Sequence, residues 1–591
     1  MIVDTLPKAL LRSVEQHTDK PALLIKRDRQ YYPITYRELY RRVFACARGL
    51  HALGVRAGDR VSIMAENGPE WAITDWAILC LGAITVPIYP TLTAQQVAEI
   101  LRDAEPTLML VSDKRQLRKA QEALEETKLS LQLVSIQPDE QGKTTTFEEL
   151  LQLPGELTES HFEHIACSVT PDEVATIIYT SGTTGEPKGA MLTHHNFISN
   201  IAACLEVIEW NPNDLFLSFL PLSHVFERCC GHFLPIYAGM TIAYAESLFT
   251  LAADMQLVRP TLMLGVPRFF ESVRDRILSS VREQTPLKQR LFHLALAVGK
   301  EVSRCWREGR PCPFTKRLLH RVLDRLVGEK IRERTGGRLR FFVSGGAALP
   351  KEIAEFFHAF GILILEGYGL TETSPVLTVN PAHAPRFGSV GKPIPGVEIR
   401  IADDGEILAR GPNIMKGYYK KPEATAAAID PDGWFHTGDI GYMDEHGYLY
   451  ITDRKKDILV LANGKNVAPQ RIENLLRASE YIQEAVVFGD GMSAPVALLV
   501  PDIERLKQYA HQQELDASDL RSLLEHDLVQ RLFRQEIEKV NRELADFERI
   551  KAFRLLPHPF TIESGELTPT LKVKRRVVAQ KYADLIQAMA R

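Results

Sequence analysis

Residues 174–189 read VATIIYTSGTTGEPKG, and this stretch decides the fold because it joins a buried strand to a loop that suits an anion. The β-branched, apolar run from Val174 to Tyr179 predicts a strand, and the hydroxyl-rich, glycine-rich run after it ends at Lys188. Glycines let backbone N–H groups converge, hydroxyls add donors and lysine adds a point charge, so the loop suits a polyphosphate. It differs from the nucleotide-kinase loop, which needs Ser or Thr after the lysine, because Gly189 stands there. On composition alone, a simple turn is the alternative.

The chain has 591 residues, of which 45% are hydrophobic and 25% charged, so it is long enough for two or more domains. Its net charge of -4 argues against a nucleic-acid partner. Residues 268–340 nevertheless contain 19 Lys or Arg against 8 Asp or Glu, an excess of 11 positive charges. Solvated surface helices are one interpretation of this basic region. Peripheral contact with an anionic membrane is the other, because each basic residue near the headgroups contributes about 1 kcal/mol.

The sequence gives no sign of secretion or of a membrane span. The first residues, MIVDTLPKALLRSVEQ, contain an early acid and no apolar core of signal-peptide length. The longest apolar run, residues 76–89, is 14 residues long and includes Pro87, whereas a spanning helix needs about 20. The 8 cysteines form no CxxC pair, which disfavours metal or disulfide use. We expect a cytoplasmic protein, with attachment to the inner face of a membrane as the option that the basic region raises.

Helix and strand patterns alternate from residue 20 to 115. Thr35 and Glu38 have capping-box spacing, apolar residues then recur at helical intervals, and Gly54 ends the run. There follow a strand-like RVSIMAE (60–66), an apolar helix over 70–82, a strand-like AITVPIY (83–89), a helix start at 93–96 and a strand-like TLMLVSD (107–113). This order predicts an α/β fold in which parallel-rich sheets are covered by helices. Residues 125–170 are less periodic and predict a variable connection.

Two motifs after the phosphate-type loop bring polar groups next to turns. Residues 221–224 read PLSH, in which His224 either caps a buried strand or lines a site. The sequence RFFVSGGAA at 340–348 predicts a strand that ends beside Gly346 and Ala347, where a flat ligand can lie against bare backbone.

Two further motifs carry aromatic and acidic groups. In LEGYGLTETSP (365–375), Tyr368 can stack on a purine, Thr371 can donate to a phosphate and Glu372 can hold Mg²⁺ through hard oxygen ligands. In DGWFHTGDIGYMDEHGYLYITDRKK (432–456), Asp439 can accept both ribose hydroxyls, and Arg454 can reach the ribose or phosphates. A turn-capping aspartate and a surface ion pair are the alternatives for these two.

The pattern of predicted elements changes after Arg454, where the sequence predicts a strand, a turn, a helix and a strand within a short segment. We therefore expect a large N-terminal domain of residues 1–454 and a small, mobile α+β C-terminal domain of residues 455–591. Near the end, residues 567–576 read LTPTLKVKRR, for which a solvated basic tail is one interpretation.

These motifs resemble, in order, those of the adenylate-forming superfamily, which includes acyl-CoA synthetases, peptide-synthetase adenylation domains and beetle luciferases. YTSGTTGEPKG resembles the phosphate loop, YGLTE the nucleotide motif, and residues 432–456 the signature stretch of fatty acyl-CoA synthetases. LTPTLK resembles the last motif of the long-chain branch. The resemblance covers roughly residues 20–580.

The resemblance implies a role for each matching residue. The phosphate loop would comprise Thr180, Ser181, Gly182, Thr183, Thr184 and Gly185. The nucleoside would contact Gly346, Ala347, Tyr368, Asp439 and Arg454; Mg²⁺ would contact Glu372 and Thr180; and Gly464 would face the coenzyme A pantetheine. The catalytic residues would be Lys572, Lys188, His224 and Thr371, with Lys456 as the hinge between the domains.

The implied activity is ATP-dependent conversion of a long-chain fatty acid to acyl-AMP with release of pyrophosphate, followed by thioester formation with coenzyme A. The implied cofactors are ATP, Mg²⁺ and coenzyme A. One alternative keeps the adenylation but changes the acceptor to the thiol of a carrier protein, as in an acyl-acyl carrier protein synthetase or an acyl-AMP ligase. Another is a non-enzymatic fatty-acid-binding or uptake protein built on an inactive synthetase, against which the complete set of motif residues argues.

Overall fold

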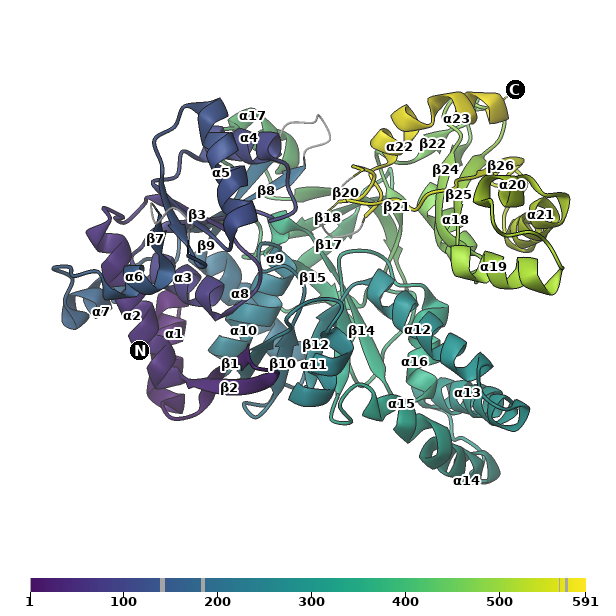
Figure 1. Cartoon of the computed structure of the whole chain (residues 1–591), viewed down its shortest axis with the longest axis horizontal. Coiled ribbons are helices and arrows are strands. Elements are labelled where there is room, and N and C mark those ends of the chain that lie inside the picture. The colour runs from purple at the N-terminus through teal and green to yellow at the C-terminus, as the bar shows by residue number, and fades with distance from the viewer. Residues whose placement is uncertain (1, 139–143, 182–186, 563, 569–571, 591) are drawn as a thin grey trace.

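The computed structural model describes residues 2–138, 144–181, 187–562, 564–568 and 572–590. It is a mixed α/β protein with a large sheet-rich part and a separate, smaller part formed by the end of the chain (Figure 1). The fold class is therefore the one that the alternating pattern predicts.

The first large sheet has eight strands in the order β19-β9-β8-β4-β3-β5-β6-β7. Its strands are β3 (Arg60–Met64), β4 (Ile84–Pro87), β5 (Leu108–Val111), β6 (Gln132–Ser135), β7 (Thr145–Thr146), β8 (Val174–Ser181), β9 (Pro187–Thr193) and β19 (Gly417–Tyr418). All neighbours from β8 to β7 pair in parallel, whereas β9 pairs antiparallel with both β8 and β19. The helices of this part of the chain are α1 (Leu6–His17), α2 (Tyr36–Ala52), α3 (Pro69–Cys80), α4 (Ala94–Ala104), α5 (Lys114–Thr127), α6 (Phe147–Gln152), α7 (Glu159–Ser168) and α8 (His194–Val207).

The second large sheet has nine strands in the order β16-β15-β14-β13-β12-β10-β11-β1-β2. Its strands are β1 (Pro21–Arg27), β2 (Gln30–Thr35), β10 (Leu215–Ser218), β11 (Thr241–Tyr244), β12 (Leu262–Gly265), β13 (Phe341–Ser344), β14 (Leu363–Gly369), β15 (Val376–Val379) and β16 (Lys392–Pro393). The connecting helices are α9 (Val225–Glu227), η1 (Arg228–Phe233), α10 (Leu234–Tyr237), α11 (Leu251–Val258), α12 (Pro267–Arg282), α13 (Pro286–Arg307), α14 (Phe314–Leu323), η2 (Asp324–Gly328), α15 (Glu329–Glu333), α16 (Lys351–Ala359) and η3 (Thr371–Thr373).

The largest apolar core lies between these two sheets. Strand residues alternate between cores: Leu262 and Leu264 pack in the central core, while Met263 packs in the outer one with helices α11, α12, α13 and α16. Helix α3 has buried residues all round its axis, which is expected of a helix enclosed between two sheets. In the same way, Ile63 faces the central core and Met64 faces helices α4 and α5. The period of two along each strand thus produces helical layers on both sides of each sheet.

A four-stranded antiparallel sheet connects the large part to the end of the chain. Its strands are β17 (Glu398–Ile401), β18 (Glu406–Arg410), β20 (Phe435–Met443) and β21 (Leu449–Arg454), and α17 (Pro422–Ala428) lies between β19 and β20 in sequence.

The smaller part has its own apolar core. It contains β22 (Leu459–Val460), β23 (Asn466–Val467), β24 (Ile482–Phe488), β25 (Val496–Pro501) and β26 (Ala552–Leu555). Its helices are α18 (Pro469–Arg477), α19 (Ile503–Gln512), α20 (Leu520–Glu525), α21 (Asp527–Asn541), α22 (Arg575–Lys581) and α23 (Ala583–Ala590).

The local predictions agree with the structure except over residues 125–170 and directly after the anion loop. The Thr35 hydroxyl caps α2 by accepting from the Glu38 amide at 3.2 Å, as the spacing predicts. The expectation of a variable connection over 125–170 misses α6 and α7 and the short strands β6 and β7. The strand β9, which begins at Pro187 and includes Lys188, is also unpredicted, and it pairs antiparallel with β8.

Candidate active site

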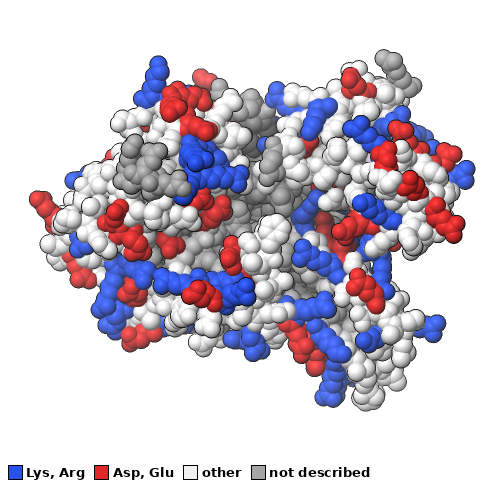
Figure 2. Space-filling view, in the orientation of Figure 1, with Lys and Arg blue, Asp and Glu red and all other residues white. Residues whose placement is uncertain are grey.

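A cavity of about 2350 Å³ lies between the large part and the smaller part of the chain. The space-filling view shows a hollow where these two parts meet (Figure 2). Seven of the residues predicted for the site border this cavity: His224, Gly346, Ala347, Tyr368, Asp439, Arg454 and Lys572. Segments separated by more than 300 residues in sequence are therefore brought to one space.

Tyr368, Asp439 and Arg454 form one connected cluster. The Tyr368 hydroxyl donates to Asp439 Oδ2 at 2.6 Å, and Arg454 Nε lies 3.2 Å from Asp439 Oδ1. Asp439 and Arg454 are register partners on β20 and β21, so the sheet itself sets their spacing. Asp439 is buried, while the Arg454 side chain is 53% exposed and can turn toward a ligand.

Lys572 comes to this cluster from the smaller part. Next to it, Val573 pairs with Leu567, and the Lys572 amide donates to the Thr568 hydroxyl at 2.9 Å. Burial, with the nearby Arg454 cation, lowers the pKa of Lys572 to about 8, while the carboxylate of Asp439 opposes the shift. The ammonium is thus held beside acceptor groups for a nucleotide.

His224 reaches the same cavity as the N-terminal cap of α9. Its Nδ1 accepts from the Phe226 amide at 3.2 Å. Burial and the Lys572 charge lower the pKa of His224 to about 4, so the imidazole is neutral at neutral pH. The predicted glycine turn lies close by: Gly346 has φ +84, a left-handed value that favours glycine, and a Cβ there would meet only Val266, at 3.7 Å.

A second cluster connects the paired strands β8 and β9 to the YGLTE motif. Lys188 Nζ lies 5.2 Å from the centre of the Tyr418 ring, and the Tyr418 hydroxyl donates to Glu372 Oε1 at 2.8 Å. Thr180 pairs with Lys188 across β8 and β9. These residues and Thr371, which begins η3, do not border the large cavity in the described part of the chain. Arg454 connects the clusters. Burial lowers the pKa of Arg454, but the nearby carboxylates, which include Asp439, Asp457 and Glu372, outweigh it and the pKa is raised.

The remaining predicted residues lie apart from the cavity or outside the described residues. Gly182, Thr183, Thr184 and Gly185 fall outside the described residues, and Ser181 ends strand β8. Gly464 has φ +76 in an exposed turn after β22 and does not line the cavity. Lys456 lies in the exposed turn between β21 and β22.

Tyr418 was missed by sequence reasoning. It lies in β19, and no glycine-rich or acidic signal marks the surrounding GYYKKP. Its importance comes from pairing with β9, where Tyr418 is the register partner of Ala190, two residues past Lys188. Only the fold brings it between Lys188 and Glu372.

Comparisons with known proteins identify the family of the chain. A family model described as AMP-binding enzyme matches residues 10–419, and one described as AMP-binding enzyme C-terminal domain matches residues 456–591. The chain belongs to the AMP-binding enzyme family. As a member, it is a nucleotide-binding enzyme.

Several relatives of this AMP-binding enzyme are similar over nearly their full length. The long-chain-fatty-acid–CoA ligase FadD15 of Mycobacterium bovis is 37% identical, over 97% of this chain and 96% of the relative. The peroxisomal long chain acyl-CoA synthetase 7 of Arabidopsis thaliana is 34% identical, over 95% and 82%. The long-chain-fatty-acid–CoA ligase 5 of Rattus norvegicus is 31% identical, over 99% and 88%.

Solved structures agree in fold. The adenylation domain of a carboxylate reductase from Mycobacterium chelonae superposes with a TM-score of 0.77 at 25% identity, covering 99% of this chain and 91% of that one. The anthranilate CoA ligase AuaEII, in complex with anthranoyl-AMP, gives a TM-score of 0.75 at 21% identity, covering 99% and 98%.

Proposed function

We propose that this AMP-binding enzyme is a long-chain fatty acid–CoA ligase that forms acyl-AMP and then a coenzyme A thioester. The observation that carries the proposal is that Lys572, from the smaller part, lies in the same cavity as the Tyr368–Asp439–Arg454 cluster. The names of relatives that are 31% to 37% identical support the choice of acyl substrate and acceptor.

The first step joins two anions, so the site must neutralise charge. The fatty-acid carboxylate attacks the α-phosphorus of ATP, the new bond is a mixed anhydride, and pyrophosphate leaves with its electron pair. Lys572 would stabilise the charge that develops on the α-phosphate, and Lys188 would hold the departing pyrophosphate. Asp439 would accept from the ribose hydroxyls, for which it must exchange the hydrogen bond from Tyr368.

Glu372 is the residue that fits Mg²⁺. No cluster of three or more His, Cys, Asp or Glu side chains that could hold a metal occurs among the described residues. Mg²⁺ commonly uses one or two carboxylates together with substrate phosphates, which matches a lone carboxylate oriented by Tyr418. When bound, the ion would neutralise phosphate charge.

The second step requires the smaller part to present a different surface. Gly464 lies in an exposed turn away from the cavity while Lys572 borders it, so a rotation about Lys456 would exchange the two. We propose residues 1–454 and 455–591 as the two bodies. Lys572→Ala should depress formation of acyl-AMP far more than thioester formation from supplied acyl-AMP, and equal loss in both half-reactions would contradict the rotation.

The test of the activity is pyrophosphate release with a panel of saturated fatty acids, followed by product analysis with coenzyme A and, separately, with purified acyl carrier protein. Release with long-chain acids and thioester formation on coenzyme A are expected. Transfer only to the carrier protein would favour the alternative acceptor. Absence of release with every acid would revive the non-enzymatic binding protein.

We also propose that the enzyme contacts membranes through α13 and α14. Phe314, Leu318 and Val322 recur at intervals of four residues and are 71%, 51% and 50% exposed. Arg317 and Arg321 occupy the adjoining row at the same spacing. In Figure 2 the lobe that contains α13 and α14 shows blue side chains beside white ones. An apolar row flanked by arginines suits an anionic bilayer surface.

Not all of the positive charge of the basic region is available to a membrane, because part of it forms ion pairs within the protein. Arg268 pairs with Glu484 and Arg282 with Glu480, both across to the smaller part. No helix in the described ranges is long and apolar enough to cross a bilayer. The membrane proposal therefore rests on the exposed apolar row of α14 and on the two arginines beside it, Arg317 and Arg321.

Flotation with vesicles of phosphatidylglycerol tests the membrane contact. The double variant Phe314→Glu, Leu318→Glu should float at least about tenfold less, since each apolar side chain contributes about 1.5 kcal/mol or more when buried. Val460→Glu is a matched control, because Val460 is also an exposed apolar residue but lies in the smaller part. Equal flotation of both variants and wild type would refute the contact.

A further inference from the structure

The loop Glu246–Thr250, between β11 and α11, exposes two large apolar side chains and is here named the mouth loop. Leu248 is 61% exposed and Phe249 is 100% exposed. A phenyl ring left fully in water gains nothing for the folded state. Its position therefore points to a partner that is not part of the folded chain.

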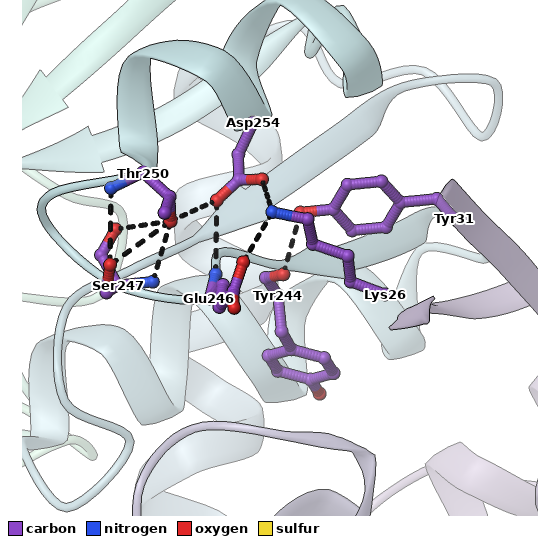
Figure 3. Close-up of polar contacts among 7 residues, drawn as sticks. All are labelled: Lys26, Tyr31, Tyr244, Glu246, Ser247, Thr250 and Asp254. Atoms are coloured by element: carbon purple, nitrogen blue, oxygen red, sulfur yellow. Dashed lines mark hydrogen bonds and ion pairs between the residues drawn. The ribbon is translucent and has the colours of Figure 1, made fainter. Parts of the chain in front are cut away.

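The base of the mouth loop is fixed by a network around one buried carboxylate (Figure 3). Asp254 Oδ2 accepts from the Glu246 amide at 3.1 Å and from the Thr250 hydroxyl at 2.9 Å. Lys26, on β1, donates to Asp254 Oδ1 at 2.7 Å and to Glu246 at 2.6 Å. Both ends of the loop are thus tied to α11, and the Glu246 end is also tied to β1.

The tip of the loop is closed by a second set of bonds. The Ser247 amide donates to the Thr250 hydroxyl at 3.1 Å, and the Thr250 amide donates to the Ser247 hydroxyl at 3.2 Å. This reciprocal pair holds the two residues between them, Leu248 and Phe249, at the turn. The exposed apolar tip is therefore fixed in one conformation. The entropy of ordering it is already lost in the free protein and is not lost again on binding.

The mouth loop borders the same cavity as the proposed catalytic residues. Ser247, Leu248 and Phe249 line it, as do Lys572 and Tyr368. Aromatic side chains form its wall on the side of α12: the Phe219 and Phe269 rings are 5.0 Å apart, and Phe269 lies 5.9 Å from Phe342. These three rings give the cavity that the loop borders an apolar section of wall.

We propose that Leu248 and Phe249 contact the alkyl chain of the substrate at the mouth of the cavity, and that Lys26 positions them. This inference rests on the proposed function. A short chain, held with its carboxylate beside Lys572, would end inside the cavity. A long chain would reach the mouth and cover the exposed ring, so the loop would select for chain length.

The test compares KM for palmitate and for octanoate in pyrophosphate release, with the acid delivered from cyclodextrin and no lipid present. Phe249→Ala should raise KM for palmitate about fivefold to tenfold, while KM for octanoate and for ATP stays within about twofold. Leu257→Ala is the matched control, because Leu257 is exposed on α11 and does not line the cavity.

Lys26 tests the positioning role separately. Lys26→Met should raise KM for palmitate in the same direction as Phe249→Ala and leave KM for octanoate unchanged, whereas Lys26→Arg should restore it. A general loss of kcat with both acids in Lys26→Met, without a change in their KM ratio, would assign Lys26 to folding alone and overturn its role.

Two outcomes would overturn the contact at Phe249. One is an unchanged palmitate-to-octanoate KM ratio in Phe249→Ala. The other is a loss of vesicle flotation in that variant with unchanged kinetics, which would make the ring a membrane contact. Failure of the wild-type enzyme to release pyrophosphate with any acid would instead refute the proposed function, so the two failures are distinguishable.

Discussion

Lys572 should impose an alkaline limit on the adenylation half-reaction. Its pKa is lowered from 10.5 to about 8, first by burial and then by Arg454. The difference corresponds to a cost of about 3 kcal/mol for holding the ammonium in the site without a ligand. Because the pKa is lowered, the cation that stabilises the phosphate is present below about pH 8 and is lost as pH rises through that value. The protonated fraction falls from about 0.9 at pH 7 to about 0.1 at pH 9.

The assay is fatty-acid-dependent exchange of pyrophosphate into ATP without coenzyme A, which isolates the first step. The value of kcat/KM for ATP reports the free enzyme and should fall roughly tenfold between pH 7 and pH 9. The corresponding fall in kcat should occur at higher pH, because the phosphates of bound ATP stabilise the ammonium form of Lys572. His224 does not contribute to this fall, because its pKa of about 4 leaves it neutral throughout.

Lys572→Arg provides the control, since a guanidinium stays charged over the whole range. Its rate should be lower but flat to about pH 9.5, and Lys572→Met should lose about a hundredfold to a thousandfold in kcat at pH 7. Either a flat wild-type profile through pH 9 or an unchanged falling limb in Lys572→Arg would refute the reasoning.

Three further predictions concern stability and the contact between the two parts. Burial raises the pKa of Glu227 to about 8, so the folded protein loses stability as pH rises from about 4.5 to 8. Glu227→Gln should remove that dependence and raise the Tm at pH 7, as measured by thermal denaturation. Asp75→Asn should cost about 3 to 5 kcal/mol in urea unfolding, because it leaves the fully buried Arg228 uncompensated, and Asp75→Asn with Arg228→Met should recover part of this. Arg268→Ala should loosen the smaller part against α12, seen as faster proteolysis after residue 454, while Arg282→Ala should have little effect because its ion pair is exposed on both sides.

Most of the candidate site residues can be selected from the sequence because each lies in a short motif. In each motif the glycines and hydroxyls suit ligand binding whatever the rest of the fold does. Asp439 and Arg454 illustrate the limit of that reasoning. Each alone fits a turn cap or a surface ion pair, and only the antiparallel register of β20 and β21 sets them across from each other. Register depends on how strands pair over the whole sheet, which no local pattern specifies.

The same limit explains Tyr418 and the basic region. Tyr418 gains its place between Lys188 and Glu372 from the pairing of β19 with β9, more than 220 residues apart in sequence. Charge counting finds the excess over residues 268–340 but cannot divide it between internal ion pairs and free surface. The structure makes that division by packing Arg268 against Glu484.

Helix α12 joins two functions that mutagenesis has to keep apart. Phe269, within its first turn, lines the cavity, and its neighbour Arg268 binds the carboxylate of Glu484 on β24. A substitution on α12 that changes chain binding therefore also changes how the smaller part is held, and with it the access of Lys572 to the site. The mouth loop is fixed to β1 and α11 instead, through Lys26 and Asp254, so a change at its tip acts on the acyl chain without passing through the contact between the two parts.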